Sequence, residues 1–438
     1  MSLLFIGISG VLLLLFFFFI KIPISIAMIL VGYLGYGTIT SFSAANRIVA
    51  GEIYTTFTSY SLSVIPMFVL MGFLGYHAGI GTRLYTFTYK AVGFLPGGLA
   101  MASQVACAVF GAICGSSTAT TATIGSIAIP EMQRYGYSDK LSTASIAAGG
   151  ALGIMIPPSV ILVLYGVATE QSISKLFLAG IIPGVLLTLL YMAAICLITL
   201  RDPSLGPPAP DSGFNLKELF KSLGGGLAGI IAVFTLSLGG LFAGWFTPTE
   251  AGGVGVAGIL LVIWFQKQLT RDVLNKALAD ATRTSAMILF LVAGATIFGR
   301  FMTITRLPFE LAHWASILPF PPFVVLLIIL LVFFFLGTFI DSLPLMLLTV
   351  PIFFPVVVNS LGYDPIWFGV IMVLVVTMGC ITPPVGINVY VIQGVARDVP
   401  LQVIFRGTWP FLIAVFTCSI LLILFPQLAT FLPQFLKI

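Results

Sequence analysis

Four short segments rich in glycine, proline or oxygen-bearing side chains interrupt a chain that is otherwise strongly apolar. Two of them carry hydroxyls or an acid, "GAICGSSTAT" (111–120) and "GTFIDSLP" (337–344). The other two contain adjacent prolines after glycines, "GGALGIMIPPSV" (149–160) and "GCITPPVGIN" (379–388). A proline removes one helical hydrogen bond and clashes with the carbonyl four residues earlier. These segments therefore predict interrupted helices with unpaired backbone carbonyls.

Interrupted helices inside an apolar chain predict sites for ions. The C-terminal end of a half-helix carries partial negative charge and suits a sodium ion, whereas the N-terminal end is partially positive and suits a carboxylate. The hydroxyls of Ser116, Ser117, Thr118 and Thr382 could complete either site. The alternative is that these hydroxyls only satisfy the backbone or pack helices together.

Asp341 lies deep in apolar sequence, between "LLVFFFLGTFI" and "SLPLMLLTV". An ionisable residue at the centre of a membrane helix costs at least about 2.5 kcal/mol and generally has a function. Asp341 could also cap the helix that follows it, and the two roles are compatible. Glu250, which follows Thr247 in "GWFTPTEAGG", is instead expected to have a structural role in the first turn of a helix.

The composition places the chain in a membrane. Of its 438 residues, 59% are hydrophobic and 8% are charged, whereas soluble proteins average about 25% charged residues. The net charge of +5 is spread over the loops and gives no indication of nucleic-acid binding. The five cysteines stand in apolar stretches without metal-binding spacing, so we expect free thiols.

The predicted fold class is an all-α polytopic membrane protein, because runs of about 20 apolar residues can cross a bilayer. The first run has no basic residues before it, so we expect it to be a retained span and not a cleaved signal peptide. The predicted spans lie near residues 3–20, 23–37, 61–80, 177–200, 223–245, 249–266, 285–302 and 407–425, with broken spans at 141–168 and 365–395.

The two halves of the chain share residues at a nearly constant offset. Gly111, Ser116, Gly153, Pro157 and Pro158 recur as Gly337, Ser342, Gly379, Pro383 and Pro384, each 226 positions later. This pattern divides the chain into a first repeat (1–200), a linker (201–222) and a second repeat (223–438). Matching segments interrupted by glycine and proline are typical of secondary transporters.

Basic residues indicate how the chain crosses the membrane. Arg83 and Lys90 precede the apolar stretch 91–131, and Arg134 and Lys140 follow it. Because lysine and arginine concentrate on the cytoplasmic side, this stretch is predicted to be a re-entrant hairpin with the hydroxyls near its tip. Two full crossings joined by a tight outer turn are the alternative.

The same rule places the N-terminus outside and the linker inside. The second half then starts on the opposite face, which predicts an inverted repeat of about five spans plus one re-entrant hairpin each, the second hairpin being 319–360. Arg300 and Arg306 would lie outside and count against this topology. Amphipathic stretches near 43–58 and 268–283 are expected to lie along the membrane interface.

Enzymatic function is not expected. His77 and His313 are the only histidines and stand far apart in the sequence. The chain has no Walker loop, nucleophile elbow or His/Cys cluster. A channel remains an alternative, although two inverted halves favour a transporter.

The segments "GAICGSSTATTATIGSIAIPEM", "GGALGIMIPPS", "FTPTEAGG" and "MGCITPPVGINVYV" resemble the large membrane subunit (M, DctM type) of tripartite ATP-independent periplasmic (TRAP) transporters. The resemblance implies an elevator-type ion-transporter fold and sodium-coupled import of organic acids, such as C4-dicarboxylates or sialic acid, across the bacterial inner membrane. It also implies two partners: a small four-helix membrane subunit on a separate chain and a periplasmic substrate-binding protein. A stand-alone symporter of the same fold is the alternative.

The resemblance also implies site residues. One sodium site would use Gly115, Ser116, Ser117, Gly149, Gly150, Pro157 and Ser159. The second sodium site would use Gly337, Thr338, Asp341, Gly379, Thr382 and Pro383. The substrate would lie between them, near Ser116, Thr118, Pro158, Ser342, Pro384 and Asn388. The hairpins and broken spans would move against a scaffold formed by the spans near 3–37, 177–200, 223–266 and 407–425.

Overall fold

The computed structural model describes residues 2–207, 216–224, 227–317 and 319–436, and these residues form helices and connecting turns without a β-strand. The first half forms α1 (Leu3–Phe19), α2 (Ile24–Ile39), α3 (Phe42–Thr58), α4 (Val64–His77), α5 (Ile80–Val92), α6 (Gly98–Cys114), α7 (Ser117–Arg134), α8 (Asp139–Gly150), α9 (Val160–Thr169) and α10 (Ile173–Arg201). The second half forms α11 (Leu216–Leu223), α12 (Leu227–Phe242), α13 (Pro248–Phe265), α14 (Arg271–Thr305), α15 (Leu307–Ile317), α16 (Pro322–Gly337), α17 (Ser342–Phe354), α18 (Pro365–Gly379), α19 (Ile387–Val395), α20 (Leu401–Leu424) and α21 (Gln427–Thr430).

The predicted all-α polytopic fold class is confirmed. Among the described residues, five helices are long and apolar enough to cross a membrane, or up to seven when each bent helix pair is taken as one span. One such pair is α3 with the segment Ser61–His77, which are bent by 58°. Of the predicted linker, residues 208–215 lie outside the described residues, and α11 begins directly after them.

The longest helix, α14, differs from the prediction. It has 35 residues, or about 52 Å at 1.5 Å per residue, well beyond a hydrocarbon core of about 30 Å. The amphipathic stretch 268–283 and the span 285–302 were expected to be separate elements. In the structure, α14 is one continuous helix that contains most of the amphipathic stretch and the whole span. The physical reason is that no proline or other stop signal stands between them.

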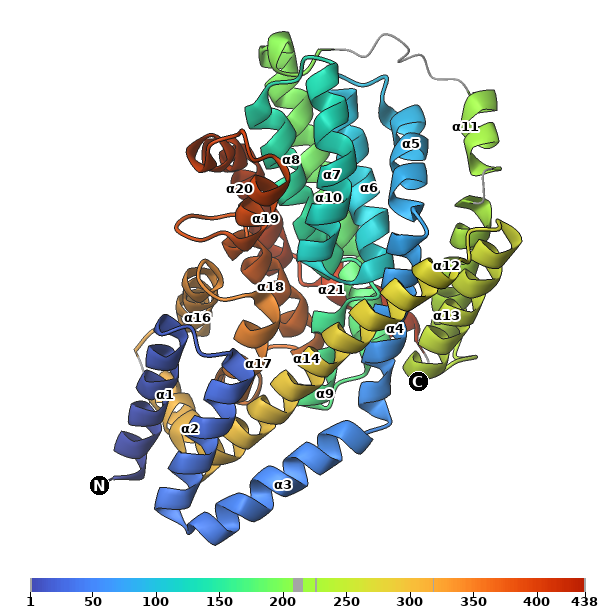
Figure 1. The fold of residues 1–438 in the computed structure, drawn as a ribbon. Helices are drawn as coiled ribbons and strands as arrows, with labels where there is room; N and C mark the ends of the chain where they lie inside the picture. The colour runs from blue at the N-terminus through green and yellow to red at the C-terminus, as the bar shows by residue number, and fades with distance from the viewer. Residues whose placement is uncertain (1, 208–215, 225–226, 318, 437–438) are drawn as a thin grey trace.

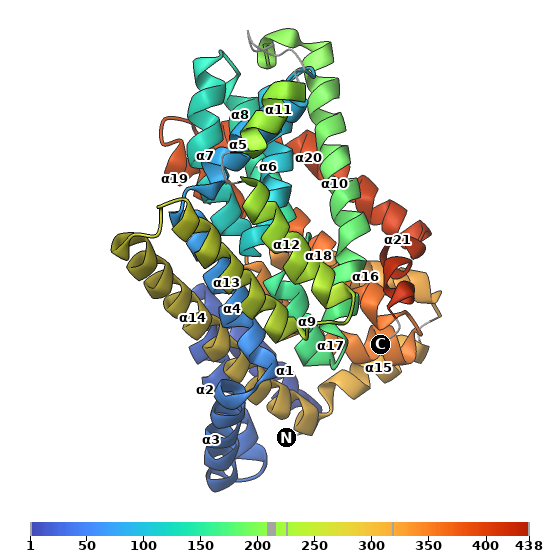
Figure 2. The same cartoon turned by 90° about the vertical axis from the view of Figure 1, so that its right-hand side faces the viewer.

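One body of the molecule is built around α14. Helices α2 and α4 pack along α14, and α13 packs against α4, so that α4, α13 and α14 run side by side (Figure 2). Helices α1 and α3 extend this body at the N-terminal end, as Figure 1 shows. We call α1–α4 and α12–α14 the scaffold.

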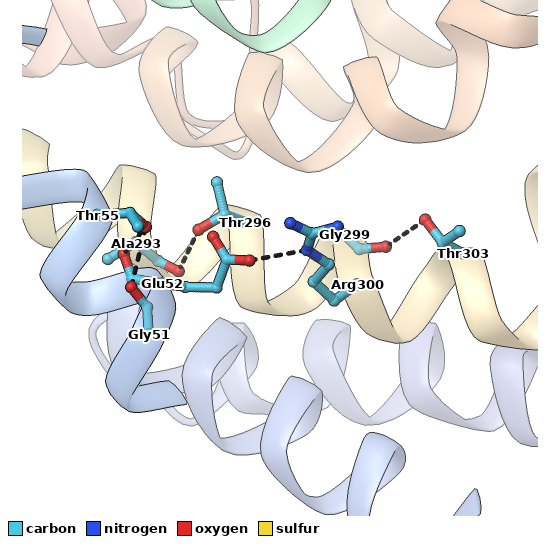
Figure 3. Close-up of polar contacts among 8 residues, drawn as sticks. All are labelled: Gly51, Glu52, Thr55, Ala293, Thr296, Gly299, Arg300 and Thr303. Atoms are coloured by element: carbon cyan, nitrogen blue, oxygen red, sulfur yellow. Dashed lines mark hydrogen bonds and ion pairs between the residues drawn. The ribbon is translucent and has the colours of Figure 1, made fainter. Parts of the chain in front are cut away.

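Arg300 has a partner that the sequence did not reveal. Its Nε donates a hydrogen bond of 2.7 Å to Oε1 of Glu52, so an ion pair joins α14 to α3 (Figure 3). The guanidinium was expected to count against the predicted topology. Its pairing with a carboxylate weakens that objection, because an ion pair carries no net charge.

A second body contains the segments that predicted the site. It comprises the helical hairpins α6–α7 and α16–α17, the interrupted pairs α8–α9 and α18–α19, and the long helices α10 and α20. The spans near 177–200 and 407–425 were expected in the scaffold, whereas α10 and α20 pack with the hairpins and interrupted helices. Helix α10 packs against α20, α6 and α18, where Tyr191 and Phe411 meet edge to face at 5.5 Å between ring centroids.

The two halves of the chain interlock within this second body. Helix α7 packs against α19 of the other half, and α17 packs against α9. A methyl group on Gly111 would overlap the backbone of Gly153, and one on Gly379 would overlap that of Gly337. These two close contacts therefore occupy equivalent positions in the two halves. The predicted domain boundaries and the inversion of the halves relative to a membrane stay predictions.

Candidate functional site

The first hairpin turns at a glycine and a serine. Helix α6 ends because Gly115 adopts a left-handed conformation with φ of 61°, which costs glycine little. Helix α7 then begins with Ser116 as its N-cap, whose side chain accepts a hydrogen bond of 3.4 Å from the backbone N–H of Ala119. The tip of the hairpin is therefore two residues long.

The interruption after α8 meets this tip. A 3₁₀ turn, Ala151–Ile154, follows α8, and Ser159 caps α9 while its hydroxyl donates to the carbonyl of Ile154 at 2.5 Å. A Cβ atom on Gly115 would lie 3.0 Å from the carbonyl oxygen of Pro158. The backbones of the hairpin tip and of the interruption are thus in contact, as an ion site of backbone oxygens requires.

The second hairpin has a different cap. Oδ1 of Asp341 accepts hydrogen bonds from the backbone N–H of Ser342 at 2.7 Å and from its hydroxyl at 3.2 Å, which makes Asp341 the N-cap of α17. The expected capping role is confirmed. In the adjoining interruption, the backbone N–H of Gly386 donates a hydrogen bond of 3.3 Å to the carbonyl of Thr338. The hydroxyl of Thr382 donates to the backbone carbonyl of Met378.

The two hairpin tips face one shared cavity of about 480 Å³. Ser116 and Thr118 line it from the first hairpin, and Asp341 and Ser342 line it from the second. The opposite wall belongs to the scaffold, through α4 and α14, and its residues include Phe73, Tyr76, Thr284 and Met287. The cavity therefore lies between the two bodies of the molecule.

The electrostatics of the cavity are unusual for a site that would hold an anion. Among the described residues that line it, none is lysine, arginine or histidine, and Asp341 supplies a carboxylate. The described residues also contain no cluster of three or more His, Cys, Asp or Glu that could hold a metal. A cation in this cavity would thus be bound by backbone carbonyls, hydroxyls and Asp341.

The hydroxyls of the first hairpin divide into two groups. Thr120, Thr121 and Thr123 donate hydrogen bonds of 2.7–2.8 Å to carbonyls four residues earlier in α7. The hydroxyls of Ser116 and Thr118 instead lie 3.3 Å apart, and both residues line the cavity. The interpretation that hydroxyls merely satisfy the backbone describes Thr120 and Thr121, whereas Ser116, Thr118 and also Thr123 line the candidate site.

Asn388 joins three elements behind the cavity. Its side chain is fully buried, and its Oδ1 accepts a hydrogen bond of 2.9 Å from the hydroxyl of Ser117. Its Nδ2 donates to the carbonyl of Ala147 at 3.0 Å. The amide therefore ties the first hairpin to α19 and α8. It is not among the residues that line the cavity.

The remaining predicted site residues have varied positions. Gly150 lies beside the carbonyl of Ser117, whereas Gly149 lies against the side chains of Gln104 and Cys107 on α6. Pro157 and Pro158 are buried, and Pro383 and Pro384 are exposed. None of these prolines lines the cavity, and their binding roles stay predictions.

Sequence reasoning missed the scaffold wall. The spans 61–80 and 285–302 were predicted, but no local signal shows which side of an apolar helix faces a cavity. It also missed the partner of His77, whose Nε2 lies 2.8 Å from Oδ2 of Asp280 and links α4 to α14. The structural role expected for Glu250 is confirmed, because it forms a capping box with Thr247.

Comparison with known proteins identifies the family. Residues 11–428 match the family described as "Tripartite ATP-independent periplasmic transporter, DctM component". The chain belongs to this family. The resemblance to the large membrane subunit of TRAP transporters is thereby confirmed.

Relatives of the chain are named for several cargoes. It is 36% identical to the C4-dicarboxylate TRAP transporter large permease protein DctM of Pseudomonas aeruginosa, over 92% of this chain and 94% of the relative. It is 34% identical to the sialic acid large permease protein SiaM of Vibrio cholerae, over 95% and 96%. It is 31% identical to the 2,3-diketo-L-gulonate large permease protein YiaN of Escherichia coli, over 93% and 94%. The chain is thus a TRAP transporter large permease subunit, and these relatives are transport proteins.

A solved structure supports the fold. The YdaH transporter of Alcanivorax borkumensis superposes with a TM-score of 0.61, over 88% of this chain and 89% of YdaH, at 16% sequence identity. At this identity the likeness concerns the fold and not the cargo. The helical membrane architecture is therefore shared with a known transporter.

Proposed function

We propose that this DctM-family subunit imports an organic acid together with sodium ions across the bacterial inner membrane. In this proposal it works with a small four-helix membrane subunit, which is a separate chain, and with a periplasmic protein that delivers the cargo. The names of the relatives support an organic acid, since they include C4-dicarboxylate and sialic acid.

The observation that carries sodium coupling is the charge of the cavity. A carboxylate cargo would share the cavity with the carboxylate of Asp341, and no described lining residue supplies a compensating cation. Two like charges about 5 Å apart repel by about 3 kcal/mol at an effective dielectric constant of about 20. A bound cation would turn this repulsion into attraction, so binding of cargo and cation would be coupled.

The residues present fit such a cation. Both hydrogen bonds to Asp341 use Oδ1, and Oδ2 accepts none from the described residues. On the other side of the cavity, the carbonyl of Pro158 reaches the tip of the first hairpin. Interrupted helices that offer carbonyl oxygens are known sodium sites in transporters, and the N-termini of α7 and α17 suit a carboxylate.

The position of the cavity supports an elevator movement. Its polar side belongs to the hairpins, and its other side belongs to α4 and α14 of the scaffold. If the hairpin body slides along this wall, the hairpin residues move with the cargo while the scaffold residues stay behind. Access then alternates between the two faces of the membrane.

Sodium binding can be tested without the cargo or the partners. Thermal unfolding of the purified chain in detergent is followed in sodium chloride and in potassium chloride at equal ionic strength. We expect a sodium-specific rise in unfolding temperature, because a ligand at 100 times its dissociation constant stabilises the native state by about 2.7 kcal/mol. The rise should shrink in Asp341→Asn and in Ser116→Ala.

Two matched variants serve as controls. Asp364→Asn alters an exposed N-cap, that of α18, and Ser126→Ala removes an exposed hydroxyl from α7. Neither residue lines the cavity. Both variants should keep the full sodium response. An equal response to potassium, or an undiminished response in Asp341→Asn, would contradict sodium binding at this site.

A further inference from the structure

Asn388, the second residue of α19, contacts both interrupted helix pairs. Its backbone N–H donates a hydrogen bond of 3.1 Å to the carbonyl of Cys380, the residue that caps the end of α18. Its side-chain Nδ2 donates a hydrogen bond of 3.0 Å to the carbonyl of Ala147, in the last turn of α8. One residue therefore binds a carbonyl at the end of each helix that precedes an interruption.

The same side chain also reaches the first hairpin. Oδ1 of Asn388 accepts a hydrogen bond of 2.9 Å from the hydroxyl of Ser117, the first residue of α7. Because the carbonyl of Ala147 can only accept a hydrogen bond, Nδ2 must face it, and this fixes the orientation of the amide. Asn388, Ser117, Ala147 and Cys380 are all buried. Hydrogen bonds in such surroundings are stronger than in water.

The three helices around this amide are packed tightly against one another. A Cβ atom on Gly125 of α7 would lie 3.0 Å from Cδ1 of Ile392 on α19 and 3.4 Å from Cγ2 of Ile146 on α8. Close-packed protein interiors transmit small displacements because they contain few voids. A shift of α8 would therefore move α19 as well.

The amide has no counterpart at the equivalent position of the first half. The offset of 226 positions that relates the two halves places Leu162 opposite Asn388. A leucine side chain forms no hydrogen bonds. The repeated architecture thus forms in the first half without a polar group at this place, so the architecture alone does not explain the amide.

We propose that Asn388 couples the two sodium sites, so that sodium bound at one interruption raises the affinity of the other. This inference rests on the proposed function, because it requires a sodium ion at each interruption. A cation bound to the carbonyls of one interruption restrains that interruption, and Asn388 transmits the restraint to the other. The second cation then meets oxygens that are already held in place, which gives positive cooperativity.

The test is equilibrium binding of radioactive sodium to the purified chain in detergent, with potassium chloride keeping the ionic strength constant. If sodium at one site raises the affinity of the other about tenfold, two sites give a Hill coefficient of about 1.5. We expect this value for the unaltered chain. Asn388→Leu removes the amide and should lower the Hill coefficient to about 1, while the midpoint concentration rises about threefold.

A second variant keeps the test decisive if Asn388→Leu is unstable. Ser117→Ala removes the hydrogen bond between Asn388 and the first hairpin and leaves the amide in place. Its Hill coefficient should lie between those of Asn388→Leu and the unaltered chain. Unfolding temperatures measured without sodium show whether each variant is folded.

The matched control is Gln104→Leu. Gln104 is also a fully buried amide, and its Nε2 donates a hydrogen bond of 2.7 Å to the carbonyl of Ser145 on α8. This bond joins α6 to α8 within the first half, so the control should keep a Hill coefficient of about 1.5. An unchanged Hill coefficient in Asn388→Leu, or an equal decrease in Gln104→Leu, overturns the coupling role of Asn388.

The number of ions bound at saturation separates this inference from the proposed function. If the unaltered chain binds no sodium in preference to potassium, the proposed sodium coupling fails. If it binds a single ion, or two ions without cooperativity, sodium coupling stands and the bridge is overturned. Asn388→Leu should bind as many ions as the unaltered chain, because Asn388 does not line the cavity. Loss of an ion in this variant would make Asn388 part of a site and not a bridge.

Discussion

At the scale of single residues, the hydroxyls of the first hairpin have two different surroundings. Thr120 and Thr121 only satisfy backbone carbonyls, Ser116 and Thr118 line the cavity, and Thr123 does both. The same contrast separates the two acids that the sequence singled out. Glu250 closes a capping box at an exposed helix start, and Asp341 combines capping with a place in the cavity. Position in the fold therefore distinguishes residues of the same chemical type.

Asn388 gives a prediction at this scale. Asn388→Ala should destabilise the chain by about 2–3 kcal/mol, because it removes two buried hydrogen bonds and leaves the partners Ser117 and Ala147 unsatisfied. Ser117→Ala should cost less, about 1 kcal/mol. In a double-mutant cycle measured by denaturant unfolding, the two should couple by about 1 kcal/mol.

The control for this cycle is Thr417→Ala, which removes an exposed hydroxyl on α20 that donates to its own helix. It should not couple to Asn388→Ala. If Ser117→Ala and Asn388→Ala prove strictly additive, the hydrogen bond between the two residues does not contribute to stability.

At the scale of elements, glycines set how closely each hairpin approaches its interrupted helix. Gly111 on α6 faces Gly153 after α8, and Gly337 on α16 faces Gly379 on α18. Because neither residue of a pair has a side chain, the two backbones come into direct contact. This approach brings the backbone oxygens of the interruption to the hairpin tip, where the candidate ion site lies.

Gly111→Ala should therefore destabilise the chain by about 1–3 kcal/mol, since a methyl group there forces the hairpin away from Gly153. The matched control is Gly299→Ala, in the interior of α14, where an added methyl group meets nothing within 4 Å. It should be neutral or stabilise by up to about 1 kcal/mol, because alanine favours helix over glycine. Equal effects in thermal unfolding would contradict the proposed packing role.

At the scale of the whole molecule, two helical bodies meet along the cavity that both hairpin tips line. The ion pair Glu52–Arg300 and the hydrogen bond between His77 and Asp280 join helices within the scaffold, and Asn388 joins elements within the hairpin body. Each of these polar contacts thus lies within one body and does not join the two. An arrangement of this kind suits a rigid movement of one body against the other.

The elevator proposal predicts that a cross-link between the bodies blocks uptake. A Cβ atom on Gly72 of α4 would lie 3.1 Å from Cβ and 2.7 Å from Cα of Cys114 on α6. Because the usual Cβ–Cβ distance in a disulfide is about 3.5–4.5 Å, the two helices must move apart slightly to admit the bond. Oxidised Gly72→Cys should therefore lose uptake of the organic acid in the complete transporter, and reduction should restore it. Phe73→Cys offers a second position on the same wall if Gly72→Cys misfolds.

The control cross-link stays within the scaffold. Gly229→Cys with Val262→Cys joins α12 to α13, because a Cβ atom on Gly229 would lie 3.9 Å from Cβ of Val262, within the usual disulfide range. Its oxidation should leave uptake intact. Undiminished uptake after complete cross-linking of Gly72→Cys to Cys114 would contradict movement of the hairpin body along α4.

The sequence by itself determined the local features of this protein. Apolar runs predicted the helices, glycine at 115 and prolines at 157 and 383 predicted where helices stop, and the caps Asp341 and Thr247 were readable from their neighbours. These features depend on a few consecutive residues, so a single segment carries the whole signal. The family resemblance added the expected chemistry of the site.

Tertiary structure alone decided what these segments face. It placed α10 and α20 with the hairpins, supplied the cavity wall from α4 and α14, and paired His77 with Asp280 and Arg300 with Glu52. An apolar helix in a membrane carries little information about its neighbours, because lipid and protein surroundings are equally apolar. Partners more than 200 residues apart are therefore fixed by helix packing and not by local sequence.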